Sequence, residues 1–185
     1  LERADDYISQ MRQQDVFHPA VAYLEGLVAE QKGNTSEAVK CWYRAMELGD
    51  KSIRIRLSLA SALSQLGDAQ SALLQLRTLV SERPDSFDGH LALAKLLARS
   101  RNWAETAEQA RMAMQLLPDN LEAALVYLQA QLQLLASGSP AGGRGSRGEN
   151  VPPTARASAE TGQMWQDMEK QLSALEKATN GADEI

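Results

Sequence analysis

An internal repeat of 34 residues is the feature that most constrains the fold of this 185-residue chain. Gly33 and Gly67 are 34 positions apart, and so are Pro84 and Pro118. Small or apolar residues recur with the same period in further sets: Gly26, Ala60 and Ala94; Ala45, Leu79 and Ala113; and Ala38 with Ala72. A fixed period of this length is typical of chains that stack one structural unit on the next. Residues 19–52, 53–86 and 87–120 align on this period without a gap, so we expect three units.

Each block is predicted to form two short amphipathic helices joined by a tight turn. In residues 53–86 a helical apolar stripe ends at "LGDA", where Gly67 suits a left-handed C-cap and Asp68 suits an N-cap. A second stripe runs from Ala69 to Val80, and Pro84 ends it because proline cannot continue a helix. The sequence contains no run of alternating β-branched residues that would predict a strand. The sequence therefore predicts an all-α protein.

The small residues of the repeat have a packing role in this interpretation. Where the two helices of one block cross closely, a large side chain would hold their backbones apart. Gly26, Ala60 and Ala94 on the first helices are expected to face Ala38 and Ala72 on the second helices.

The pattern resembles the tetratricopeptide repeat, a 34-residue helix–turn–helix unit. The matching positions are Gly26, Ala38, Trp42, Ala45, Leu59, Ala60, Ala72, Pro84, Leu93, Ala94, Ala113 and Pro118. The resemblance implies a right-handed superhelical solenoid built from such repeats. Asp50 stands where a proline is expected, and Thr106 stands where a small alanine belongs, with Ala107 one step late. We therefore expect a slight displacement of the second helix of the third block.

The array is predicted to span residues 1–136. Ala4, Ile8 and Met11 suit the second helix of a preceding repeat, so residues 1–17 are interpreted as half a repeat, and the natural protein is expected to continue upstream. Residues 120–136 predict a single capping helix, which a stack needs to shield its last apolar face.

Composition changes after the array. Residues 137–158 are rich in Gly, Pro and Ser, which predicts a flexible linker. They include the letters Gly143-x-Gly145-x-x-Gly148, which match a dinucleotide-binding fingerprint. That fingerprint would follow a strand and open a helix, whereas this stretch follows a predicted helix and precedes Pro152. We expect no nucleotide there.

Residues 159–180 are predicted to form an amphipathic C-terminal helix. Trp165, Met168, Leu172 and Leu175 recur at spacings of three, four and three, which makes one narrow apolar seam. A helix of this length is marginal alone in water, so it should dock on something. We expect it to pack on the solenoid, to pair with a second copy of the same helix, or to bind in the groove of its own or a neighbouring chain.

The sequence gives little support for catalysis or metal binding. Cys41 is the only cysteine, and His18 and His90 are the only histidines, too few for an ordinary structural zinc site. No serine or cysteine has a histidine at a spacing typical of a nucleophile and its base. No apolar run is long enough to span a bilayer. "GGRGSRG" is similar to an Arg-Gly RNA-binding segment, but it occurs once in a chain of net charge −5. We expect no catalytic residue, no cofactor, no metal, no nucleic-acid partner and no direct membrane insertion.

The resemblance implies where a partner would bind. In such solenoids the concave face, lined mainly by the first helix of each repeat, binds peptides or helices of other proteins. The corresponding residues are Tyr23, Leu27, Gln31, Arg54, Leu57, Ser61, Gln65, Leu91, Lys95 and Arg99, with Leu125 and Gln129 on the cap. Tyr23, Leu57 and Leu91 are equally suited to the core. The clamp with which one subfamily holds chaperone C-termini is absent, because its positions hold Tyr23, Leu27, Asp88 and Ala92.

Charge is distributed unevenly along the chain. Residues 1–50 carry 5 basic and 9 acidic side chains, residues 51–118 carry 9 and 6, and residues 119–185 carry 5 and 9. Arg54, Lys95 and Arg99 would place part of the central positive charge in the groove, which favours an acidic partner.

We therefore expect a non-catalytic scaffold or adaptor that binds a peptide or helix of a partner protein, with the C-terminal helix as a competitor. Two alternatives stay open. One is a spacer or oligomerisation segment of a longer protein, such as a bacterial envelope or secretion scaffold, and the other is an accessory domain of an enzyme. Cytoplasmic and periplasmic locations also both stay open.

Overall fold

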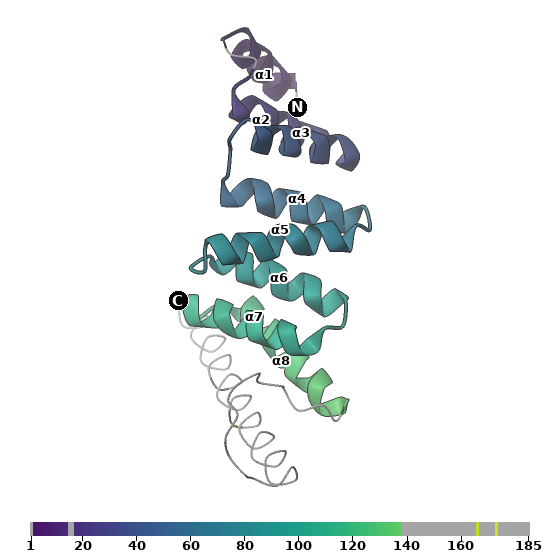
Figure 1. The fold of residues 1–185 in the computed structure, drawn as a ribbon, viewed down its shortest axis with the longest axis vertical. Coiled ribbons are helices and arrows are strands. Elements are labelled where there is room, and N and C mark those ends of the chain that lie inside the picture. Colours follow the sequence, from purple (N-terminus) through teal and green to yellow (C-terminus); the bar gives the residue numbers. More distant parts are fainter. Residues whose placement is uncertain (1, 15–16, 138–165, 167–172, 174–185) are drawn as a thin grey trace, which may run out of the picture. The chain divides into compact units, whose positions relative to one another are not determined.

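The computed structural model describes residues 2–14 and 17–137, together with residues 166 and 173. All regular structure within these residues is helical, which confirms the predicted all-α class (Figure 1). The helices are α1 (Glu2–Gln14), α2 (Pro19–Gln31), α3 (Thr35–Glu47), α4 (Ile53–Gln65), α5 (Ala69–Glu82), α6 (Phe87–Arg99), α7 (Trp103–Leu116) and α8 (Leu121–Ala136). The predicted linker, apart from Ser137, lies outside the described residues, as does the predicted C-terminal helix apart from Gln166 and Ser173.

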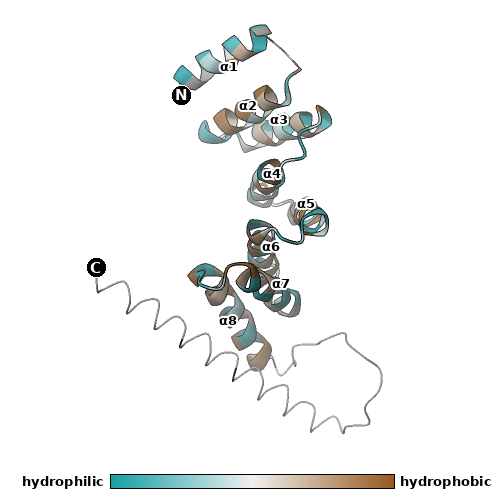
Figure 2. Cartoon of the chain, turned by 90° about the vertical axis from the view of Figure 1, so that its left-hand side faces the viewer, coloured by the Kyte–Doolittle hydropathy of each residue, from teal (hydrophilic) through white to brown (hydrophobic). Residues whose placement is uncertain are grey.

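The chain divides into two compact units, residues 1–84 and 85–185. In the first unit α1 packs on α2, α2 on α3, α3 on α4 and α4 on α5. In the second unit α6 packs on α7 and α8, and α7 packs on α8. Apolar and polar residues alternate along these helices (Figure 2), and most of the buried residues are apolar.

The helix boundaries follow the sequence period. Pro19, Ile53, Phe87 and Leu121 begin α2, α4, α6 and α8, and consecutive starts are 34 residues apart. Thr35, Ala69 and Trp103 begin α3, α5 and α7 with the same spacing. The residue at which α7 begins therefore keeps the period, and the displacement expected for this helix stays a prediction. Thr106 is fully buried, and its Oγ1 donates a hydrogen bond to the carbonyl oxygen of Asn102 at 2.7 Å, so the polar atom of this larger side chain is satisfied within its own helix.

The turns inside the helix pairs use the left-handed backbone region, as predicted at Gly67. Gly33, Gly67 and Arg101 occupy equivalent positions with φ of 79°, 82° and 57°. Only glycine enters this region without steric cost, so Arg101 holds a strained conformation. After Gly67, the side chain of Asp68 accepts a hydrogen bond from the backbone N–H of Ser71 at 3.0 Å, which confirms the predicted N-cap.

The first unit contains a close contact between α2 and α3. A methyl group added at Gly26 would lie 2.3 Å from Nε1 of Trp42, so only glycine fits against this indole ring. The indole N–H donates to the carbonyl oxygen of Tyr23 at 3.2 Å, and Trp42 is completely buried. Gly26 therefore faces Trp42 of α3, a larger neighbour than the alanines expected from the sequence.

A polar link joins the two helices of the next two pairs at equivalent positions. The guanidinium of Arg56 donates to Oε1 of Gln75 at 3.4 Å and to the carboxylate of Glu82 at 3.0 Å. Nδ1 of His90 lies 2.8 Å from Oε1 of Gln109, so the imidazole donates there. Arg56 and His90 are both buried, and these bonds satisfy Nη1 and Nη2 of Arg56 and Nδ1 of His90, whereas Nε of Arg56 is buried without a hydrogen-bond partner among the described residues.

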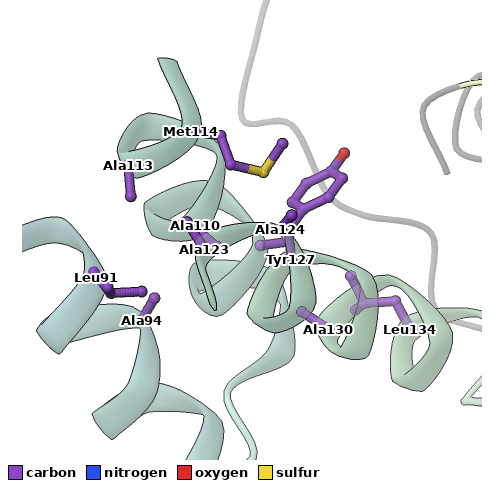
Figure 3. Close-up of a cluster of buried hydrophobic side chains, with 11 residues drawn as sticks. Leu91, Ala94, Ala110, Ala113, Met114, Ala123, Ala124, Tyr127, Ala130 and Leu134 are labelled. Carbon is purple, nitrogen blue, oxygen red and sulfur yellow. The ribbon is translucent and has the colours of Figure 1, made fainter. Parts of the chain in front are cut away.

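The core of the second unit is a cluster shared by α6, α7 and α8 (Figure 3). Small residues allow the three helices to approach, and larger ones fill the space between them. Its members are Leu91, Ala94, Ala107, Ala110, Ala113, Met114, Ala123, Ala124, Tyr127, Ala130 and Leu134.

Candidate functional site

In the first unit, the predicted groove residues lie on α2 and α4. On α4 the side chains of Arg54, Ser61 and Gln65 are exposed and that of Leu57 is half-buried. These positions follow one another at three- and four-residue spacings, so they form one stripe along the helix. The remaining face of α4, which includes Ile55 and Leu59, is buried. The stripe is a polar surface with one partly exposed leucine.

The three predicted residues of α2 are less accessible. Tyr23 and Leu27 are half-buried, and Gln31 is exposed. The carbonyl oxygen of Tyr23 is occupied by the indole of Trp42. The phenol ring and Leu27 therefore offer only part of their surface to a ligand.

In the second unit, the predicted residues lie on α6 and α8. Lys95 and Arg99 are exposed on α6, and Leu125 and Gln129 are exposed on α8. An ion pair between Lys95 and Glu122 places the exposed stripe of α6 beside the first turn of α8. The structure thus brings Lys95 together with the part of α8 that carries Leu125.

Leu91 was assigned to the groove, but its side chain is buried. Its side chain is 7% exposed and belongs to the core cluster with α7 and α8. The equivalent position on α8 is Leu125, which is 53% exposed. The difference arises because α8 packs beside α6, which covers Leu91.

Lys95 and Arg56, two basic residues of the middle region, contribute less positive charge to the protein surface than the sequence suggests, because each forms an ion pair. Glu122 neutralises part of the charge of Lys95 through their ion pair. Arg56 is buried and paired with Glu82, so it adds nothing to the exposed stripe. Arg54 and Arg99 are also exposed on the predicted stripes.

An ion-pair cluster that the sequence did not predict joins α1, α2 and α3 in the first unit. Glu25 of α2 is 11% exposed in its side chain and pairs with both Arg12 of α1 and Arg44 of α3. The equivalent positions hold Leu59, Leu93 and Tyr127, all of them buried. The break in an otherwise apolar repeat position was the signal in the sequence for this cluster.

The described residues show no arrangement suited to catalysis by metal or thiolate. Within residues 2–14 and 17–137 no group of three His, Cys, Asp or Glu side chains could hold a metal ion. Burial raises the pKa of the Cys41 thiol, and the carboxylates of Glu25 and Glu37 raise this pKa further. Cys41 is therefore a protonated core thiol near neutral pH. Among the helices that the structure describes, none combines the length and the apolar character that crossing a bilayer requires.

The predicted docking helix cannot be placed from the structure. Trp165, Met168, Leu172 and Leu175 lie outside the described residues. Gln166 and Ser173 are described, and both are helical and exposed.

Comparisons with known proteins identify the fold. No family model and no curated protein sequence matches the chain. Among solved structures, MamA matches with a TM-score of 0.68 and 14% identity, covering 94% of this chain and 87% of that protein. YrrB, described as a TPR protein with an unusual peptide-binding site, matches with a TM-score of 0.61 and 18% identity over 95% of this chain and 83% of that one.

A third solved structure is shorter. The first TPR of Spaghetti (RPAP3), bound to the HSP90 peptide SRMEEVD, matches with a TM-score of 0.59 and 17% identity, covering 63% of this chain and 93% of that one. Identities at this level establish a shared fold and nothing more specific. The chain therefore has the helical repeat fold of tetratricopeptide-repeat proteins.

Proposed function

We propose that this chain is a non-catalytic scaffold that binds a peptide or helix of a partner protein on the exposed stripes of its first helices. The observation that carries the proposal is the exposure of Arg54, Ser61 and Gln65 along one face of α4. The opposite face of this helix is buried. Two proteins of the same fold support it, because the first TPR of Spaghetti is bound to an HSP90 peptide and YrrB has an unusual peptide-binding site.

The preferred partner is acidic. Arg54 in the first unit and Lys95 and Arg99 in the second are exposed cations on these stripes. Exposed charges contribute mainly to association rate and orientation, and salt screens them. Because Glu122 already pairs with Lys95, we assign the smaller part of this preference to Lys95.

The C-terminal helix competes with the partner in this proposal. Residues 159–180 carry Asp167, Glu169 and Glu176, so the helix has the charge expected of the ligand. A linker of 22 residues (137–158) spans roughly 25 Å root-mean-square, enough to let the helix reach a surface of its own chain. A partner would then bind by displacing it.

A selection of short random peptides against the immobilised full chain tests the proposal. We expect enrichment of acidic peptides and at least about tenfold weaker binding to Arg54→Ser/Arg99→Ser, since a lost pair of favourable charges of this kind is worth about 1.4 kcal/mol. Lys51→Ser/Arg111→Ser is the matched control, because both residues are exposed, lie off the stripes and remove the same charge. Equal binding by both double variants, or no enrichment, would refute the proposed surface.

A further inference from the structure

The last helix differs from the other first helices by a continuous leucine seam. Leu121, Leu125, Leu128, Leu132 and Leu135 follow one another along α8 at spacings of four, three, four and three. This is the heptad spacing of a coiled-coil seam, and it places all five side chains within one narrow stripe. Leu121, Leu125 and Leu132 are 46%, 53% and 53% exposed. Leu128 is buried and Leu135 packs against the core cluster, so the exposed part of the seam consists of Leu121, Leu125 and Leu132.

The residue at the centre of the seam determines how a partner helix can pack. Leu128 stands at the repeat position that holds Gly26 in α2, Ala60 in α4 and Ala94 in α6. At Gly26 the second helix comes so close that even a methyl group would collide with Trp42. A leucine at this position keeps a neighbouring helix further away. Leu128 is itself 8% exposed, so a helix that docks on α8 contacts chiefly the long exposed side chains of Leu121, Leu125 and Leu132.

Resting on the proposed function, in which this segment competes with a partner, we propose that segment 159–180 of the same chain docks as an antiparallel helix on the exposed leucines of α8, next to the predicted groove residues Leu125 and Gln129. Trp165, Met168, Leu172 and Leu175 have spacings of three, four and three, which is the complementary heptad pattern. Gln166 and Ser173, one heptad apart on the opposite side of such a helix, are helical and exposed. The linker begins where α8 ends and keeps the segment at an effective concentration on the order of millimolar.

The antiparallel direction follows from charge. On the segment, Glu169 and Glu176 flank the apolar seam on the side that Glu122 and Gln129 flank on α8, counted in the same rotational sense. Two facing helices bring such equivalent flanks together only when they run in opposite directions. The Lys95–Glu122 ion pair shows that α6 lies on this side of α8. Antiparallel docking therefore turns Glu169 and Glu176 toward the flank of α8 that carries Glu122, whose charge Lys95 partly neutralises, and toward the exposed Arg99 of α6.

A buried polar atom beside the seam fits the same arrangement. The amide of Gln131 donates to the hydroxyl of Tyr127 at 2.6 Å, while its Oε1 is buried and has no hydrogen-bond partner within the described chain. Gln131 flanks the seam on the side away from Gln129. In the antiparallel pair, Gln171 of the segment occupies the corresponding flank and carries the amide donors that this oxygen lacks.

Hydrogen exchange of the full chain tests the docking without any partner protein. We expect amides of residues 159–180 to exchange at least about tenfold more slowly than in the isolated peptide, as a helix docked nine-tenths of the time requires. Leu125→Ser/Leu132→Ser should remove the protection. Leu66→Ser/Leu74→Ser is the matched control, because these leucines are 48% and 63% exposed on the first unit and should leave the segment protected.

A second variant covers the case in which the α8 changes disturb folding. Met168→Ser/Leu172→Ser lies outside the array and should remove the protection while leaving the helical content of residues 1–137 unchanged. Exchange as fast as in the free peptide, or protection that survives both seam variants, would overturn the proposal. Protection that disappears on dilution together with a dimer mass would also overturn it, because the occupant would then be a second copy.

Discussion

Gly26 and Trp42 form a close helix–helix contact in the first unit, since a methyl group at Gly26 would lie 2.3 Å from Nε1 and 2.5 Å from Cδ1 of the indole. We expect Gly26→Ala to destabilise the protein by about 1–2 kcal/mol, because the overpacking penalty exceeds the gain in helix propensity. Chemical denaturation measures this difference. The double variant Gly26→Ala/Trp42→Leu recreates the residues found at the equivalent positions Ala60 and Leu76. The alanine should be better tolerated in that background, and an equal penalty in both would contradict the contact.

The strained turn at Arg101 gives a prediction of the opposite sign. Arg101 has φ of 57° at a position where the other two pairs use Gly33 and Gly67. We expect Arg101→Gly to stabilise the protein by about 1 kcal/mol, because it relieves a left-handed conformation. Gly67→Ala, with φ of 82°, should destabilise by a similar amount. Thermal unfolding of both variants checks the pair, and a loss of stability in Arg101→Gly would refute the strain.

The Glu25 ion pairs predict how α1 is held. Glu25 pairs with Arg12 of α1 and Arg44 of α3, and both arginines are about half-exposed, so solvent screens much of the interaction. We expect Glu25→Gln to cost about 1 kcal/mol and to speed amide exchange in α1 more than in α4. Glu37→Gln, which breaks an exposed pair with Lys40 only, is the control. Unchanged exchange in α1 would show that apolar contacts alone hold this helix.

The buried thiol of Cys41 gives a prediction about pH. Its pKa is raised in the folded protein, chiefly by burial and then by Glu25 and Glu37. The folded state therefore keeps its proton more tightly than the unfolded chain. The resulting stabilisation is fully present below the unfolded thiol pKa and is lost as pH rises through the folded value. Alkylation of native protein near pH 8 should be slow and should accelerate on unfolding, whereas equal rates would contradict the burial.

The sequence predicted the helices better than it predicted the surface. The period of 34, the glycine turns and Pro84 are local signals, because each depends on backbone geometry that the residue itself dictates. Leu91 could not be assigned in this way, since its burial depends on α8 packing beside α6. The pairing of Lys95 with Glu122, from outside its own repeat, likewise depends on tertiary structure.

Two departures from the repeat place a larger side chain in a buried position. Thr106 looked disruptive in the sequence, but its hydroxyl bonds to the carbonyl oxygen one turn earlier, and the helix start does not shift. Leu128 stands at the position of Gly26, Ala60 and Ala94, and this larger side chain is also buried.

The most direct test of the proposed scaffold function is a fluorescence titration of a labelled peptide of residues 159–185. It would be added to residues 1–137 and, in parallel, to the full chain, at low and high salt. The account predicts saturable binding to residues 1–137 that weakens with salt, and weaker binding to the full chain because its own segment occupies the surface. If residues 1–137 are helical by circular dichroism and still bind no peptide, the surface does not accept an acidic helix and the account is wrong.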